Sequence, residues 1–203
     1  MRYKLSTPAE PAARPARHAE DGFTLVEVLV AIVVLSFGLL GMVGLQAAAL
    51  KYNRDARNQS VAVSLARELA EMMRSNAQVA GLSTGNPYYG SFSGTALAPS
   101  TTSACLSIGN TCASTTDLAN AQMTDWLTRV EDALPGARVE VCDDSAPYDT
   151  NGLPVWTCTP ATATAPISVI KLGWTREDTQ NKVGFANATK PYVVFPVTPG
   201  GQS

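Results

Sequence analysis

The sequence predicts an α+β fold, in which a long N-terminal helix precedes a shorter helix and several short strands. Two observations support this prediction. Residues 23–50 form an apolar run, and residues 51–78 continue it as an amphipathic segment without Gly or Pro, which indicates one helix. In residues 79–203, turn residues then alternate with short apolar runs, a pattern typical of strands.

Residues 23–50 are long and apolar enough to span a bilayer, for which about 20 residues suffice. Their only charge is Glu27. A secretory signal peptide cleaved after the alanines at 47–49 is the alternative, but its apolar core would be unusually long. All four cysteines follow the run, and disulfides require an oxidising compartment. We therefore expect a single-pass inner-membrane protein whose C-terminal domain is periplasmic.

Positive charge does not decide this topology. Four basic residues precede the apolar run and four follow it closely, so the two ends are balanced under the positive-inside rule. The residues that follow the run are Lys51, Arg54, Arg57 and Arg67.

Residues 22–27, with the sequence GFTLVE, resemble the signature of type IV prepilins: a Gly, a new N-terminal Phe, and an apolar helix with Glu at its fifth position. The resemblance implies that a prepilin peptidase cleaves between Gly22 and Phe23 and that the amine of Phe23 is methylated. Residues 1–22 are then a leader that is removed. Residues 23–50 remain on the protein as a transmembrane helix and later as part of a filament core.

Glu27 has two interpretations. A carboxylate within a membrane is costly and usually marks function, and this one lies about 6 Å along the helix from Phe23. In a filament, Glu27 is expected to pair with the Phe23 amine of a neighbouring subunit and so to set the axial register. The local interpretation is a capping box, since Thr24 and Glu27 have the T-x-x-E spacing. The two interpretations are compatible.

Composition narrows the function. Of 203 residues, 45% are apolar and 16% are charged, and the net charge is −2. The chain has no long basic run, which disfavours nucleic acid as a direct partner. Its one histidine, His18, lies in the leader, so a processed chain lacks Ser-His-Asp and Cys-His catalysis and any His-ligated metal. We expect a protein that is not an enzyme and has no cofactor or metal.

The amphipathic segment points to a family. Residues 69–76, with the sequence LAEMMRSN, together with the apolar run resemble the PilV-type minor pilins, the type IV pilus modification proteins. The resemblance implies the pilin fold: α+β, with a long N-terminal helix, membrane-spanning in its first half, packed on a small antiparallel β-sheet. Trp126 and residues 134–136 and 170–174 also look like that family. The apolar stripe that would face the sheet is Val61, Leu65, Leu69, Met72 and Met73.

The cysteines predict two disulfides. Cys105 and Cys112 lie within residues 75–116, a stretch without charge that is rich in Ser, Thr, Gly and Ala and therefore indicates loops. Four cysteines allow three pairings. We favour Cys105–Cys112, which closes a small loop, and Cys142–Cys158, which would tie two strands together. The spacing and the lack of histidine disfavour zinc.

The remaining C-terminal elements are one helix and four strands. Residues 116–134 have an apolar face, and Pro135-Gly136 ends that helix. Turn residues separate the expected strands, which are residues 137–142, 155–159, 167–174 and 192–197.

Acidic residues cluster near the first two of these strands. A calcium-binding loop is one interpretation, but the spacing does not match a known calcium loop, and a solvated turn is favoured. The cluster consists of Glu140, Asp143, Asp144 and Asp149.

Three functions follow from these features. The resemblance implies a minor pilin that helps to initiate type IV pilus assembly in a priming complex at the pilus tip. Its partners would be the prepilin peptidase, other minor pilins, the major pilin and a tip adhesin. The alternative is a minor pseudopilin of a type II secretion system, which shares the motif and the fold. A membrane-anchored periplasmic enzyme is disfavoured by the missing histidine and by the lack of any phosphate loop or metal spacing.

Overall fold

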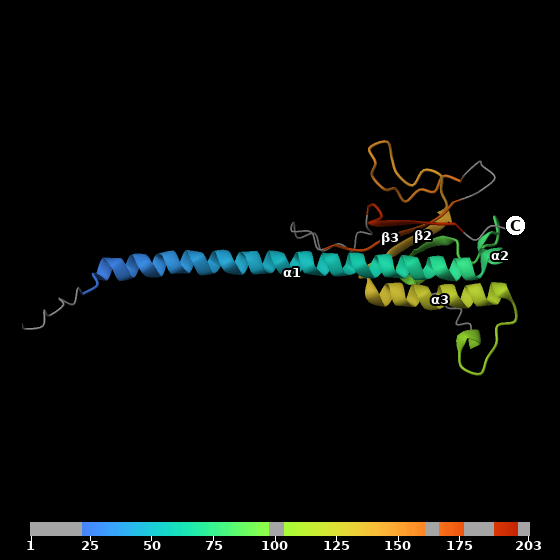
Figure 1. Ribbon diagram of the computed structural model, residues 1–203, viewed down its shortest axis with the longest axis horizontal. Helices are drawn as coiled ribbons and strands as arrows, with labels where there is room; N and C mark the ends of the chain where they lie inside the picture. Colours follow the sequence, from blue (N-terminus) through green and yellow to red (C-terminus); the bar gives the residue numbers. More distant parts are fainter. Residues whose placement is uncertain (1–21, 98–103, 161–166, 177–188, 199–203) are drawn as a thin grey trace, which may run out of the picture. The chain divides into compact units, whose positions relative to one another are not determined.

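The computed structural model describes residues 22–97, 104–160, 167–176 and 189–198. Of the leader expected at residues 1–22, only Gly22 is among them. The chain divides into two compact units, Met1–Ala48 and Ala49–Ser203. Helix α1 (Leu25–Ser75) begins in the first unit and ends in the second (Figure 1).

In the first unit, α1 is apolar on every side. All residues from 22 to 48 are exposed. Ser36 satisfies its hydroxyl within the helix by donating a hydrogen bond of 2.7 Å to the main-chain carbonyl of Ile32. A helix that is hydrophobic all round requires a membrane or a protein partner around it.

In the second unit, α1 is amphipathic, as the stripe predicts. Val61 and Met72 pack against the core with partial burial. The helix ends at Ser75, three residues before the end of the predicted segment 51–78, because Asn76 leaves the helical conformation and donates a side-chain hydrogen bond of 2.8 Å to the carbonyl of Thr115. The buried face of α1 consists of Ala62, Leu65, Ala66, Leu69, Ala70 and Met73.

Helix α3 (Thr115–Ala133) lies beside α1 (Figure 1) and matches the predicted helix within one residue at each end. The hydroxyl of Ser114 caps it by accepting a hydrogen bond of 3.0 Å from the main-chain N–H of Asp117. Trp126, on its buried face, donates a hydrogen bond to the main-chain carbonyl of Leu65 on α1. The two helices therefore form one packed pair.

The uncharged stretch contains more structure than the predicted loops. It includes α2 (Ala77–Ala80), strand β1 (Gly90–Ser93) and single 3-10 turns at Gly94–Leu97 and Ala104–Leu106. Tyr88 is fully buried, and its hydroxyl donates a hydrogen bond of 2.7 Å to Gln122 on α3. This buried tyrosine anchors the stretch to the helix pair.

In the part of the chain that the structure describes, four antiparallel strands form a single sheet. The strands are β1, β2 (Arg138–Asp143), β3 (Ser168–Gly173) and β4 (Val193–Val197), and their spatial order is β1-β2-β3-β4. The strands predicted at 137–142, 167–174 and 192–197 are confirmed. The α+β class and a long N-terminal helix packed on a small antiparallel sheet are confirmed as well.

The strand predicted at residues 155–159 is wrong. Both edges of β2 are already paired, with β1 and with β3, so no position beside β2 remains for it. The main-chain carbonyls of Trp156 and Thr157 instead accept hydrogen bonds of 3.4 and 2.8 Å from Lys171 Nζ. The Lys171 ammonium thus takes up main-chain carbonyls that a strand would use for hydrogen bonds to a neighbouring strand.

Strand β3 is buried on both faces. Because side chains alternate along a strand, Ile170 and Leu172 face the core shared with α1 and α3, while Val169 and Lys171 lie on the opposite face. The loop of residues 144–159 covers that opposite face and lies on the side of the sheet away from α1 (Figure 1).

Both favoured disulfides are present. Cys105 pairs with Cys112, seven residues along the chain, and Cys142 pairs with Cys158, a separation of 16 residues. Since residues 155–159 are not a strand, the second disulfide ties the covering loop to β2 rather than joining two strands.

Candidate processing and assembly segment

The expected cleavage site lies just before α1 begins. Residues 22–24 are not helical, and the helix starts at Leu25. Phe23 is 80% exposed, and a Cβ added to Gly22 would meet no atom within 4 Å. The described part of the chain therefore imposes no steric requirement for glycine at position 22.

Thr24 caps the N-terminus of α1. Its hydroxyl accepts a hydrogen bond of 3.3 Å from the main-chain N–H of Glu27, and its carbonyl accepts from the same N–H at 3.0 Å. This is one half of the expected capping box. The main chain of Glu27 makes these bonds, and its exposed carboxylate has no described partner within residues 22–97, 104–160, 167–176 and 189–198.

The helix that follows has the length and hydropathy of a membrane span. An 18-residue window of α1 has a mean hydropathy of 2.7, and none of that window is buried. The core helix of a soluble protein would be buried, so that interpretation fails. The apolar core of a secretory signal sequence is also apolar and exposed. The sequence motif at residues 22–27 therefore has to distinguish a membrane anchor from a signal sequence.

Two family models match the chain. Residues 17–43, which include Gly22, Phe23 and Glu27, match the prokaryotic N-terminal methylation motif. Residues 44–124 match the Tt1218-like family, described as type IV pilin Tt1218. The chain is similar to type IV pilins and carries their N-terminal motif. Comparison with curated proteins and with solved structures gives no match.

These matches agree with the fold. Type IV pilins are structural proteins, and the pilin match points to no catalytic function. The methylation motif implies processing by a prepilin peptidase and assembly with other pilins. The apolar part of α1 fits an inner-membrane anchor for such a pilin.

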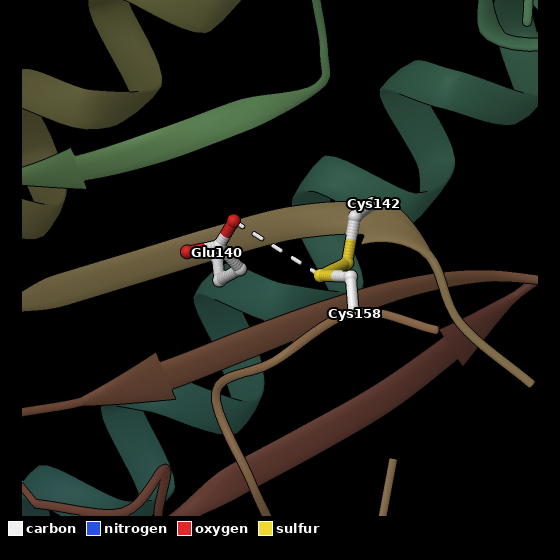
Figure 2. A group of neighbouring side chains, drawn as sticks. All are labelled: Glu140, Cys142 and Cys158. Atoms are coloured by element: carbon white, nitrogen blue, oxygen red, sulfur yellow. Dashed lines mark hydrogen bonds between the residues drawn. A yellow bond between two sulfur atoms is a disulfide. The ribbon is translucent and has the colours of Figure 1, made fainter. Parts of the chain in front are cut away.

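One group of side chains has the spacing of a metal site without its chemistry. Glu140, Cys142 and Cys158 offer ligand atoms that lie within 4.8 Å of one another (Figure 2). The two sulfur atoms are bonded to each other, so neither is a thiolate, the form that binds metals, and neither carries a hydrogen to donate. The 4.0 Å approach of Cys158 Sγ to Glu140 Oε1 is therefore a van der Waals contact.

The acidic cluster does not converge on a cation. The carboxylate of Asp143 accepts a hydrogen bond of 2.6 Å from the hydroxyl of Tyr89. The carboxylate of Asp149 accepts two hydrogen bonds of 2.9 Å from the main-chain N–H groups of Asn151 and Leu153, and these bonds lower its pKa. Because the carboxylates of Asp143 and Asp149 have separate partners, this geometry does not support the calcium-binding interpretation.

Asp144 is buried, so the solvated-turn interpretation is wrong for this residue. Its Oδ2 lies 2.5 Å from Lys171 Nζ, and both side chains are fully buried. Its Oδ1 accepts hydrogen bonds of 3.0 Å from the main-chain N–H groups of Ala146 and Thr159. Burial by itself raises the pKa of Asp144, but the hydrogen bonds from Lys171 and from the two amides outweigh burial and lower it.

The Lys171–Asp144 pair is the main feature that sequence reasoning missed. The available signal was Lys171 itself, a lone cation within the apolar run of residues 167–174. A lysine on a strand that is buried on both faces needs a buried anion or several carbonyls as partners. Here Lys171 has both, which fixes the covering loop onto the sheet.

Proposed function

We propose that the chain is a minor pilin of the PilV type, which helps to initiate type IV pilus assembly within a priming complex at the pilus tip. The observation that carries the proposal is the methylation motif at residues 17–43, which includes the start of a helix that is apolar at first and amphipathic where it meets the sheet. The resemblance of residues 69–76 to PilV-type proteins supports the subtype.

In this proposal, the peptidase removes residues 1–22 and the new amine of Phe23 is methylated. The amine remains cationic after methylation, and it would pair with the Glu27 carboxylate of a neighbouring subunit as the helix leaves lipid. An unpaired carboxylate in an apolar filament core is strongly disfavoured. Pairing between Phe23 and Glu27 is possible at one axial offset of the helices, so it would set the register.

The proposed location is the inner membrane, with a single span and the second unit in the periplasm, followed by the pilus tip. The two disulfides support an oxidising compartment for the second unit. The proposed partners are the prepilin peptidase, other minor pilins, the major pilin and a tip adhesin.

The N-terminal mass of the chain extracted from membranes tests the processing step. We expect a mature chain that starts at methylated Phe23. A start near Leu50 would indicate an ordinary secreted protein, and an intact Met1 would indicate a simple membrane anchor. Either result would contradict the proposal.

A deletion strain tests the choice between pilus and secretion system. Loss of surface pili with normal protein secretion supports the minor pilin. Loss of secretion with normal pili would instead assign the chain to a type II secretion system as a minor pseudopilin, because that class shares the processing motif and the fold.

A further inference from the structure

Helix α1 carries a cluster of basic side chains directly after its apolar segment. Lys51, Arg54 and Arg57 follow within seven residues of Leu50, and Asp55 is the only acid among them. The chain as a whole has a net charge of −2, whereas residues 51–57 carry a net positive charge. The side chains of Arg54 and Arg57 are exposed, and that of Lys51 is half-buried.

We propose that residues 51–57 form a membrane-surface contact that binds the headgroups of anionic phospholipids. This inference rests on the proposed function, since it requires residues 23–50 to span a bilayer. Continuity identifies the occupant, because α1 runs through Leu50 without a break. A helix that fills the hydrocarbon with its apolar part brings the next residues to the headgroup layer. Charge then favours anionic over zwitterionic lipids.

The length of the helix places the cluster at a suitable depth. At 1.5 Å per residue, the apolar part of α1 from Leu25 to Leu50 is about 38 Å long. A bilayer has a hydrocarbon core of about 30 Å and a total thickness of about 40–45 Å. Lys51 therefore follows at the outer boundary of the headgroups. Arg54 and Arg57 lie about 4.5 and 9 Å farther along the axis, and their long side chains can extend back toward the phosphates.

Tyr52 is a second, independent sign of an interface. Its side chain is 72% exposed, although it lies on the part of α1 that belongs to the second unit. Tyrosine concentrates where a membrane meets water, because its ring is apolar and its hydroxyl is polar. Tyr52 suits the boundary between hydrocarbon and water, and the basic residues around it suit negatively charged headgroups.

The test measures lipid preference at the protein surface. The chain of residues 23–203 is reconstituted in phosphatidylcholine vesicles with a trace of spin-labelled phosphatidylglycerol or spin-labelled phosphatidylcholine. The motionally restricted fraction of each label gives its relative affinity for the protein. We expect the anionic label to be preferred about fivefold, the scale of one basic contact at a membrane surface, and the preference to disappear at high salt. No preference for the anionic label would overturn the inference.

Paired variants locate the contact. Lys51→Gln with Arg57→Gln should abolish most of the preference. The control is Arg67→Gln with Arg74→Gln, which removes the same charge from a part of α1 farther from the apolar segment. In that part of the helix, Arg74 forms an exposed ion pair with Glu71. The control should keep the native preference, and an equal loss in both variants would contradict the assignment to residues 51–57. A thermal melt confirms that each variant is folded.

The lipid-preference experiment and the test of the proposed function can fail independently. A recombinant chain that starts at Phe23 is inserted into vesicles whether or not cells process the protein. A missing lipid preference together with correct processing would refute only the headgroup contact. A wrong N-terminus in cells would refute only the pilin proposal.

Discussion

The indole nitrogen of Trp126 donates a hydrogen bond of 2.9 Å to the main-chain carbonyl of Leu65. Both residues are buried, and they lie 61 residues apart in the sequence. The bond joins α3 to α1 within the second unit. Helix α3 is therefore held by a direct polar contact in addition to apolar packing.

Replacement of Trp126 by Phe should lower the free energy of unfolding of the second unit by about 1–3 kcal/mol, because a buried hydrogen bond is lost and the smaller ring leaves a gap. Urea denaturation of the chain in detergent, followed by near-UV circular dichroism, measures this change. Tyr148→Phe is the control, since that side chain is 50% exposed and should change stability little. Equal effects of the two substitutions would contradict the structural role of Trp126.

Replacement of Asp144 by Asn should be strongly destabilising, by about 3–5 kcal/mol, because it leaves the buried ammonium of Lys171 without its counter-ion. The combined change of Asp144→Leu and Lys171→Met should cost much less, since no buried charge remains. Urea denaturation of the two variants provides the comparison. A double variant that is no more stable than Asp144→Asn would show that the pair itself is not responsible.

The same pair predicts a response to acid. The pKa of Asp144 lies below its ordinary value of 3.8, so the ionised carboxylate is favoured in the folded state. Its contribution to stability is complete above the ordinary pKa and is lost as the pH falls through the lowered value. Melting temperatures measured between about pH 2 and pH 6 should therefore fall more steeply for the native chain than for the double variant with Asp144→Leu and Lys171→Met. Parallel curves would exclude this linkage.

The two disulfides should contribute unequally. In the chain-entropy model, removing Cys142–Cys158 costs about 3 kcal/mol and removing Cys105–Cys112 about 2 kcal/mol, because the closed loops differ in length, with separations of 16 and 7 residues. Paired Cys→Ala variants, compared by urea denaturation, measure the difference. The reverse ranking would show that packing around each loop outweighs loop length.

Replacement of Glu27 by Ala should leave leader cleavage intact and reduce assembly at least tenfold if one buried ion pair is lost. Immunoblots of membranes and of sheared pili give the two readouts. Thr24→Ala is the matched control, because it removes the helix cap and keeps the carboxylate. Normal assembly of the Glu27 variant, or an equal defect in the Thr24 variant, would contradict the proposed register role.

Much of the fold could be predicted because long, periodic segments carry a strong signal. The apolar stripe that contains Leu65 and Leu69 located the buried face of α1, and Pro135-Gly136 located the end of α3. Strand β1 could not be predicted, since its residues, GSFS, have no apolar alternation. Its hydrogen bonds with β2 come from the tertiary structure rather than from local preference.

The strand prediction for residues 155–159 fails for a related reason. Residues 155–159 include Val155, Trp156 and Thr157, which favour strands, yet the ladder position that they would need is occupied. The N-terminal segment differs, because the match of residues 17–43 to the methylation motif depends on local sequence and not on contacts with the rest of the fold. A short motif of this kind can be recognised from the sequence alone, whereas the buried pair of Asp144 and Lys171 depends on contacts between distant segments.

Because β3 is covered on both faces, the loop of residues 144–159 acts as an outer wall of the second unit. Shortening this loop would do more than remove exposed residues. It would uncover a sheet face that carries Val169 and a lysine whose neutralising carboxylate and carbonyl partners had been removed. Sequence variation in the second unit should therefore be tolerated at the exposed tip of the loop, near Tyr148 and Leu153, and resisted at its two ends, where the disulfide and the Asp144 carboxylate fasten it.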